Sequence, residues 1–205
     1  MALDEILFRQ MEEGYGGPPV LRFYMAAEPW ITVGYSHRNG TVQGIPVCRR
    51  MTGGGIVQHG KDVIFSIVAR KADDESFASV RMSYLKIHEA VKSAVENLGK
   101  SPRFYRCDEN LAKGSDCFLY PIATDLALAG RKIAGGAQKR SRGALLHQES
   151  LQLRSVERED LIAAVKTGFQ SRFAVELKKW DLDPVTFHAA QRLAEEKYGP
   201  DKNAK

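Results

Sequence analysis

The spacing of apolar residues changes along the chain, and each change predicts a different element. Where apolar residues recur every three or four positions, the pattern predicts an amphipathic helix. A helix that begins at Asp183-Pro184 is expected for a further reason, because aspartate is a favoured N-cap and proline suits the first helical position. The predicted helices cover residues 1–13, about Val80 to Leu98, Ser155 or Val156 to Phe169, and Asp183 to the stop signal Gly199-Pro200.

Strands are predicted where apolar residues alternate with polar ones, or run together between turn signals. The run from Val63 to Val68 is almost wholly apolar, which is typical of a central strand with both faces covered. The other predicted strands are Val20–Tyr24, Trp30–Tyr35, Ile45–Arg50, Arg103–Cys107 and, as a last one, Phe173–Leu177.

This mixture of strands and outer helices predicts an α+β fold with a mixed or antiparallel β-sheet and flanking helices. The chain has 205 residues, enough for one domain with a substantial core. We expect a single domain over residues 1–205, with a disordered tail at 198–205 and no accessory domain.

The stretch from Cys117 to Leu153 contains the first candidate chemistry. It combines a predicted strand that ends at Leu128, a turn at Ala129-Gly130, and a lysine, Lys132, close to the pair Gly135-Gly136. Glycines let a ligand approach the backbone, and Lys132 can then place its ammonium group against a carbonyl or phosphate oxygen. The simpler alternative is an ordinary hairpin with a surface lysine.

A second glycine cluster precedes the strand at Val63. Arg49 and Arg50 lead into Met51, Thr52 and the triplet Gly53-Gly54-Gly55, and His59 closes the motif. Three consecutive glycines weaken any helix or strand, but they leave backbone N–H groups that can surround an anion or an acyl carbonyl. The two arginines add positive charge and forked donors.

Taken together, RRMTGGGIVQH, GRKIAGGAQKR and LLHQESLQL resemble the lipoate–protein ligase and octanoyltransferase family, which is related to the biotin ligases. The opening MALDE, LRFY at 21–24 and VGY at 33–35 are similar to the same family, so the resemblance covers nearly the whole chain. It implies the fold of a biotin/lipoate ligase catalytic domain. In that family a strand precedes the first helix, and no such strand stands before Ala2.

The resemblance is strongest to the cysteine-dependent octanoyltransferases, because Cys117 stands 15 residues before Lys132 in a similar context. It implies that Cys117 is the nucleophile that carries the acyl group as a thioester. A nearby Lys132 would favour the thiolate and stabilise the oxyanion of each tetrahedral intermediate. This enzyme would attach an octanoyl or lipoyl group to a lysine of a lipoyl carrier domain without a cofactor. The alternative is that Cys117 is a small buried residue at the start of a strand.

Three other functions stay open. The triplet Gly53–Gly55 is more similar to the ATP-dependent lipoate ligases, which would need ATP and Mg to form a lipoyl-adenylate. A biotin ligase fits the context of Lys132 less well. A non-catalytic member that binds an acyl ligand is the remaining alternative.

The resemblance also implies a set of substrate-binding residues. Arg49 and Arg50 are expected to position the loop and the ligand, since arginine stays protonated. His59 and His147 are candidates to orient a base or the acceptor amine, or else are histidines satisfied within strands. His88 is expected to be a surface or interface residue and not a ligand. The full predicted set is Arg49, Arg50, Thr52, Gly53, Gly54, Gly55, His59, Gly135, Gly136, Ala137 and His147, with no metal ligand.

The composition limits the kinds of binding partner and the cellular compartment that we expect for this protein. The formal charge is +5, but Lys and Arg are scattered, which argues against a nucleic-acid site and fits steering toward acidic proteins. The family resemblance supplies acyl carrier protein as donor, and a 2-oxoacid dehydrogenase lipoyl domain or glycine cleavage H protein as acceptor. No membrane span or secretory signal is predicted, and the unpaired cysteines Cys48 and Cys107 are assigned to packing, so we expect a cytoplasmic protein.

Overall fold

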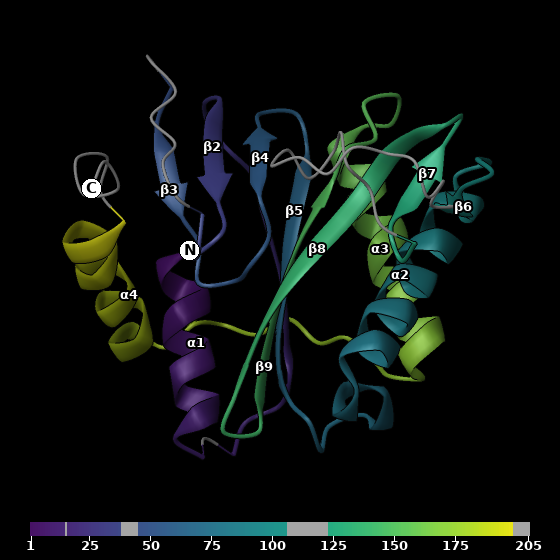
Figure 1. Cartoon of the computed structure of the whole chain (residues 1–205). Coiled ribbons are helices and arrows are strands. Elements are labelled where there is room, and N and C mark those ends of the chain that lie inside the picture. Colours follow the sequence, from purple (N-terminus) through teal and green to yellow (C-terminus); the bar gives the residue numbers. More distant parts are fainter. Residues whose placement is uncertain (15, 38–44, 106–122, 199–205) are drawn as a thin grey trace.

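Two β-sheets and four α-helices make up the described part of the chain in this computed structural model, which comprises residues 1–14, 16–37, 45–105 and 123–198 (Figure 1). The larger sheet has the order β1-β5-β9-β8-β7-β6, and the smaller has the order β3-β2-β4. All neighbours are antiparallel except β2 and β3, which are parallel. The predicted α+β class with a mixed sheet is therefore confirmed.

The strands of the larger sheet are β1 (Val20–Tyr24), β5 (Val63–Arg70), β9 (Ala144–Leu151), β8 (Arg131–Ser141), β7 (Leu126–Leu128) and β6 (Arg103–Phe104). Those of the smaller sheet are β3 (Val47–Arg49), β2 (Trp30–Val33) and β4 (Ile56–His59). The helices are α1 (Ala2–Glu12), α2 (Val80–Asn97), α3 (Arg158–Phe173) and α4 (Pro184–Lys197), with a 3₁₀ turn over Glu75–Ala78.

The two central strands explain where the core lies. Every residue of β9 and all but the last of β5 are buried, because helices cover both faces of this part of the sheet. Helices α2 and α3 pack together on one face and enclose the main core with Phe65, Leu145 and Leu151 (Figure 1). Helix α1 covers the other face through Leu7 and Phe8, and α4 packs against α1. None of the helices in the described segments combines the length and apolar character that a membrane span requires.

Two tight hairpins join β7, β8 and β9. The first turns at Ala129-Gly130 and the second at Arg142-Gly143, and all four residues have positive φ, the conformation of the turns that best match strand twist. The predicted turn at Ala129-Gly130 is thus confirmed. The β7–β8 pairing shifts register at Leu126/Ala127, which places a bulge beside Lys132.

One predicted element is wrong. Phe173 is the last residue of α3 and not the start of a strand, because its ring stacks on Phe169 one turn earlier and packs against the main core. The helix ends at Ala174, whose φ of 52° is left-handed, and the chain then has no regular structure until α4. The predicted cap of α4 is confirmed, since the Asp183 side chain accepts a hydrogen bond from the Thr186 amide.

A buried carboxylate ties α1 to the sheet. Asp4 is fully buried and accepts hydrogen bonds from Arg22 of β1, Ser66 of β5 and Gln148 of β9 at 2.6 to 2.7 Å. Burial alone would raise the pKa of Asp4, but nearby positive charge, including Arg22, and the hydrogen bonds from Ser66 and Gln148 together lower it below its ordinary value. Charge and hydrogen bonds therefore outweigh desolvation at this residue.

We expect the stability conferred by Asp4 to depend on pH. A carboxyl group whose folded pKa is depressed stabilises the fold above its unfolded pKa of about 3.9, and this contribution is lost as the pH falls through the folded pKa. Asp4→Asn should therefore cost on the order of 1–3 kcal/mol at pH 7 and progressively less toward pH 3. Urea unfolding of both proteins between pH 7 and pH 3 measures this, and a difference that stays constant would contradict it.

Candidate functional site

A cavity of about 310 Å³ lies between the two sheets. Its walls come from both of them, which explains why segments far apart in the sequence meet there. The smaller sheet and its glycine loop supply Thr32, Arg50, Gly53, Gly54, Val57 and His59. The larger sheet supplies Tyr24, Ile64, Lys132, Gly135, Gly136, Ala137, Gln138, Gln148, Glu149 and Ser150, and Met1, Tyr84 and Asp125 complete the lining.

Lys132 reaches the cavity from the bulged start of β8. Its Nζ lies 2.6 Å from Asp125 Oδ2, and the two side chains are only 6% and 4% exposed. The lysine folds back over Gly135, where a Cβ atom would lie 2.1 Å from Lys132 Cε. Gly135 therefore makes room for the lysine itself, which is a more specific role than the general approach of a ligand to the backbone.

Gly136 makes room for a second group. Glu149 is its partner across the β8–β9 ladder, and a Cβ at Gly136 would lie 2.3 Å from Glu149 Oε2 and 2.5 Å from His147 Cε1. The two glycines thus admit a lysine and a glutamate to neighbouring positions on the cavity wall.

The side chain of Arg50 holds the backbone of the glycine triplet in place. The guanidinium group of this buried arginine donates to the carbonyl oxygens of Gly53 and Gly55 and to Thr32 Oγ1, at 2.9 to 3.0 Å. Arg49 points elsewhere and donates to the carbonyl oxygens of Gly34, Tyr35 and His37. Both arginines therefore fix the backbone around the loop.

His59 is oriented by two buried partners. Its Nδ1 lies 2.6 Å from Asp62 Oδ2, and its Nε2 lies 2.8 Å from Thr32 Oγ1. Thr32 Oγ1 also accepts a hydrogen bond from Arg50, and the Nδ1 side of the imidazole faces the Asp62 carboxylate. Burial would raise the pKa of Asp62, but the hydrogen bond and charge of His59 lower it. This arrangement fixes the orientation of the His59 ring at the cavity wall.

A few side-chain hydrogen bonds connect the two sheets. Thr52 Oγ1 donates to Gln148 Oε1 at 2.8 Å, and Ser150 Oγ donates to Asp62 Oδ2 at 2.7 Å. Gln148 and Ser150 belong to β9, whereas Thr52 and Asp62 flank the smaller sheet.

Behind the wall, Glu149 is bound by two histidines. His88 and His147 are both fully buried, and their Nε2 atoms lie 3.0 and 2.8 Å from Glu149 Oε2. The expected surface position of His88 is therefore wrong, because His88 lies on the inward face of α2. Burial alone would raise the pKa of Glu149, but His88 and His147 lower it to about 2. Burial would lower the pKa of His88, and Glu149 raises it above its ordinary value. Burial also lowers the pKa of His147.

The structure brings most of the predicted site residues together. Those that line the cavity are Lys132, Arg50, Gly53, Gly54, His59, Gly135, Gly136 and Ala137. Four others lie close by but outside the lining, namely Arg49, Thr52, Gly55 and His147. The predicted nucleophile, Cys117, lies outside the described residues, as does Cys107.

Sequence reasoning missed several lining residues, of which Asp125, Gln148 and Glu149 are the most polar. A signal for two of them was present. Gln148 and Glu149 stand in the sequence between the apolar run at 144–146 and Leu151, and polar side chains within a buried strand need partners.

The comparison with protein families agrees with this geometry. The sequence model of the family described as "Lipoyl protein ligase A/B catalytic domain" matches residues 1–174, the region that contains both glycine motifs. The chain belongs to this family. Curated relatives of this lipoyl protein ligase A/B domain include the octanoyltransferase LipM of Oceanobacillus iheyensis, 34% identical over 161 residues, and that of Moorella thermoacetica, 32% identical over 179 residues.

These alignments cover 75% and 81% of this chain but 59% and 64% of the two relatives, so the chain spans less than two thirds of their length. A crystal structure of lipoate-protein ligase A bound with ATP has a TM-score of 0.77 with 22% identity, and the match covers 96% of this chain and 89% of that one. The lipoic acid complex of Ta0514, a putative lipoate protein ligase of T. acidophilum, gives the same values. These likenesses confirm the lipoate ligase catalytic-domain fold.

Proposed function

We propose that this protein attaches an octanoyl or lipoyl group to a lysine of a lipoyl carrier domain, by transfer through a thioester on Cys117. The observation that carries the proposal is the meeting of Lys132 and the glycine loop around one cavity. An ammonium group fixed beside an acyl-sized space can stabilise the negative charge that develops on the carbonyl oxygen in acyl transfer. The two curated relatives described above are both octanoyltransferases, which supports the same reaction.

The cavity suits an acyl chain. Apolar side chains of Val57 and Ile64 and the rings of Tyr24 and Tyr84 form part of its wall. Its volume of about 310 Å³ is at the lower end of the range of about 300–1,000 Å³ for ligand pockets. Lys132 and Asp125 are among the charged side chains of its wall.

The proposed reaction has two exchanges. The Cys117 thiolate attacks the carbonyl carbon of the donor thioester, and the donor thiolate leaves and takes up a proton. The amine of the acceptor lysine then attacks the new thioester, Cys117 leaves as the thiolate, and an amide forms with loss of one amine proton. In both steps the negative oxygen of the tetrahedral intermediate is stabilised by Lys132, which Asp125 holds in position.

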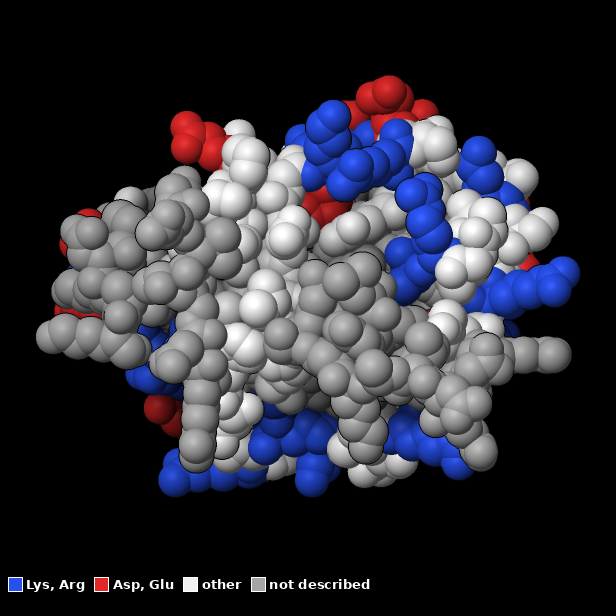
Figure 2. Space-filling model, turned by 45° about the horizontal axis from the view of Figure 1, so that its top comes forward, with Lys and Arg blue, Asp and Glu red and all other residues white. Residues whose placement is uncertain are grey.

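The proposed partners are acyl carrier protein as donor and a lipoyl carrier domain as acceptor. Figure 2 shows Lys and Arg in several separate groups on one face of the molecule, and the whole chain has a net charge of +5. This distribution favours the approach of acidic proteins without forming one continuous basic patch.

An ATP-dependent lipoate ligase is the second candidate. The observation that favours it is the open space at the glycine loop, since no heavy atom lies within 4 Å of the place a Cβ of Gly53 would take. Free space there would accept a larger ligand than an acyl chain alone. ATP, Mg and free lipoate would then be required.

The experiment that separates the two candidates is intact mass spectrometry after mixing with octanoyl-acyl carrier protein. We expect an added octanoyl mass on the enzyme that disappears in Cys117→Ala and moves to a lipoyl domain when one is added. Cys48→Ala is the matched control, because Cys48 is buried in β3 outside the cavity. No adduct, together with acceptor modification only in the presence of ATP and lipoate, would replace the transferase with the ligase.

A further inference from the structure

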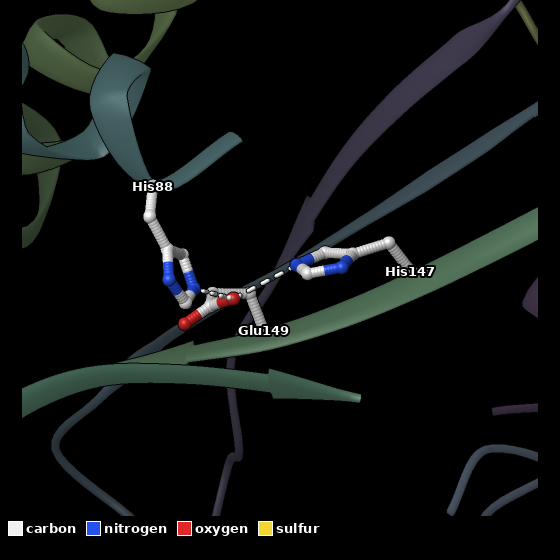
Figure 3. Close-up of side chains that lie close together, drawn as sticks. All are labelled: His88, His147 and Glu149. Atoms are coloured by element: carbon white, nitrogen blue, oxygen red, sulfur yellow. Dashed lines mark hydrogen bonds and ion pairs between the residues drawn. The ribbon is translucent and has the colours of Figure 1, made fainter. Parts of the chain in front are cut away.

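Two histidine side chains and one glutamate side chain converge behind the cavity wall, on the side of the larger sheet that faces α2. His147 and Glu149 are two residues apart on β9 and therefore project from the same face, and His88 reaches them from α2 (Figure 3). One nitrogen of each histidine and one carboxylate oxygen of Glu149 lie within 4.8 Å of one another. All three side chains are buried.

The outer nitrogens of both histidines have partners that orient the rings. His88 Nδ1 contacts the carbonyl oxygen of Thr124, which can only accept, so Nδ1 carries a proton and Nε2 faces Glu149. His147 Nδ1 lies 3.2 Å from the side-chain amide of Gln138, which presents either its nitrogen or, rotated, its oxygen. A histidine held by a carbonyl at its outer nitrogen is the usual arrangement around a metal ligand.

The carboxylate has one atom still unsatisfied. Glu149 Oε1 is buried and has no hydrogen-bond partner within the described segments of the chain. Glu149 also lines the cavity, and the missing side chain at Gly136 leaves the carboxylate and His147 room at this point. A cation bound by both carboxylate oxygens would satisfy Oε1, which the two histidine contacts to Oε2 do not.

We propose that His88, His147 and Glu149 form a binding site for a divalent transition-metal cation, with zinc as the best match. Two histidines and one glutamate are a known three-ligand set for zinc, in which a further position stays open. Zinc–ligand distances of about 2.0–2.2 Å place tetrahedral ligand atoms about 3.3–3.5 Å apart. The present separations of 2.8 and 3.0 Å would therefore open by about 0.5 Å as the metal replaces the protons between the rings and the carboxylate.

The proposed metal site adjoins the cavity, so a molecule in the cavity can fill the open coordination position of the metal. Because Glu149 belongs to the cavity lining, a cation on it would be within reach of a water molecule or an oxygen of a cavity ligand. Binding of the cation needs no acyl donor or acceptor. Cation binding can therefore be measured independently of the transfer reaction, so a failure of one proposal is distinguishable from a failure of the other.

The test uses the full chain without an affinity tag, stripped with a chelator. Zinc binding is measured in competition with a chromophoric chelator, and Co²⁺ is used as a visible probe. We expect one metal ion per chain. Glu149→Gln and His88→Ala should each weaken binding by more than about 100-fold, since loss of a ligand costs more than loss of its outer partner. His188→Ala, which removes an exposed histidine of α4, should bind as the parent protein does.

The proposal fails if the parent protein binds less than one zinc ion per chain at micromolar free metal, or if both variants retain its affinity. Should the variants not fold, X-ray absorption of the zinc-loaded parent protein decides alone. Two imidazole nitrogens and a carboxylate around the metal support the site, and any other ligand set overturns it.

Discussion

Replacing Lys132 with methionine is expected to slow acyl transfer by about 10²–10³-fold, the usual effect of removing one donor from a developing oxyanion. Methionine keeps the length and the apolar stem of the side chain, so the change removes little besides the charge. The measurement is the rate at which a lipoyl domain gains an octanoyl mass from octanoyl-acyl carrier protein.

The Lys132→Met variant must be compared with a double variant, because Lys132 also balances the charge of the buried carboxylate of Asp125. Removing one member of a buried ion pair costs about 3–5 kcal/mol, which could itself lower activity. In Lys132→Met/Asp125→Asn the lone charge is gone, so we expect stability to recover while transfer stays slow. Lys178→Met, which removes an exposed lysine, should behave like the parent protein. If the double variant regained the parent rate, Lys132 would be a structural residue only.

Replacing Gly34 with alanine is the second change with a large expected effect. A Cβ at Gly34 would lie 1.9 Å from the carbonyl oxygen of Gly54 and 2.9 Å from the carbonyl carbon of Gly53, and both contacts are with backbone. No side-chain rotation relieves such a clash, so the glycine loop must move. We expect a loss of about 1–3 kcal/mol in unfolding free energy, typical of overpacking, and a reduced transfer rate because Gly53 and Gly54 line the cavity.

Two other glycines serve as controls for Gly34→Ala. Gly16 and Gly53 both have open space where a Cβ would stand. Gly16→Ala should therefore leave both urea unfolding and transfer unchanged. Gly53→Ala should keep the stability but narrow the cavity. A Gly34→Ala protein with the stability and rate of the parent would show that the loop yields without cost.

Periodicity predicted most elements because it reports directly on burial. The apolar run at Val63–Val68 became the core of β5, and the local chemistry of Asp183-Pro184 fixed the start of α4. The strand expected at Phe173–Leu177 was wrong for a related reason. A few β-branched and aromatic residues fit a strand or the end of a helix equally well, and only the contact of Phe173 with Phe169 and the core decides.

The sequence motifs of the candidate site could be predicted, but the residues that contact those motifs could not. Lys132 and the glycines stood out by residue type, whereas Asp125 and Glu149 are ordinary acidic residues until the sheet register pairs them with Lys132 and with Gly136. His88 could have been placed correctly. It lies four residues after Tyr84 and three before Val91, on the apolar stripe of α2, so its position in the helix already indicated burial.

The small number of hydrogen bonds between the described residues of the two sheets affects how firmly the cavity walls are held. In the described part of the molecule, the glycine loop is joined to β9 through the Thr52–Gln148 contact, and Asp62 is joined to it through Ser150. Each is a single side-chain hydrogen bond, worth about 0.5–1.5 kcal/mol, whereas either sheet is held by a whole ladder of them. Among these described residues, the contact between the two sheets therefore contains far fewer hydrogen bonds than either sheet, and we expect the cavity to widen along this contact when it admits a ligand.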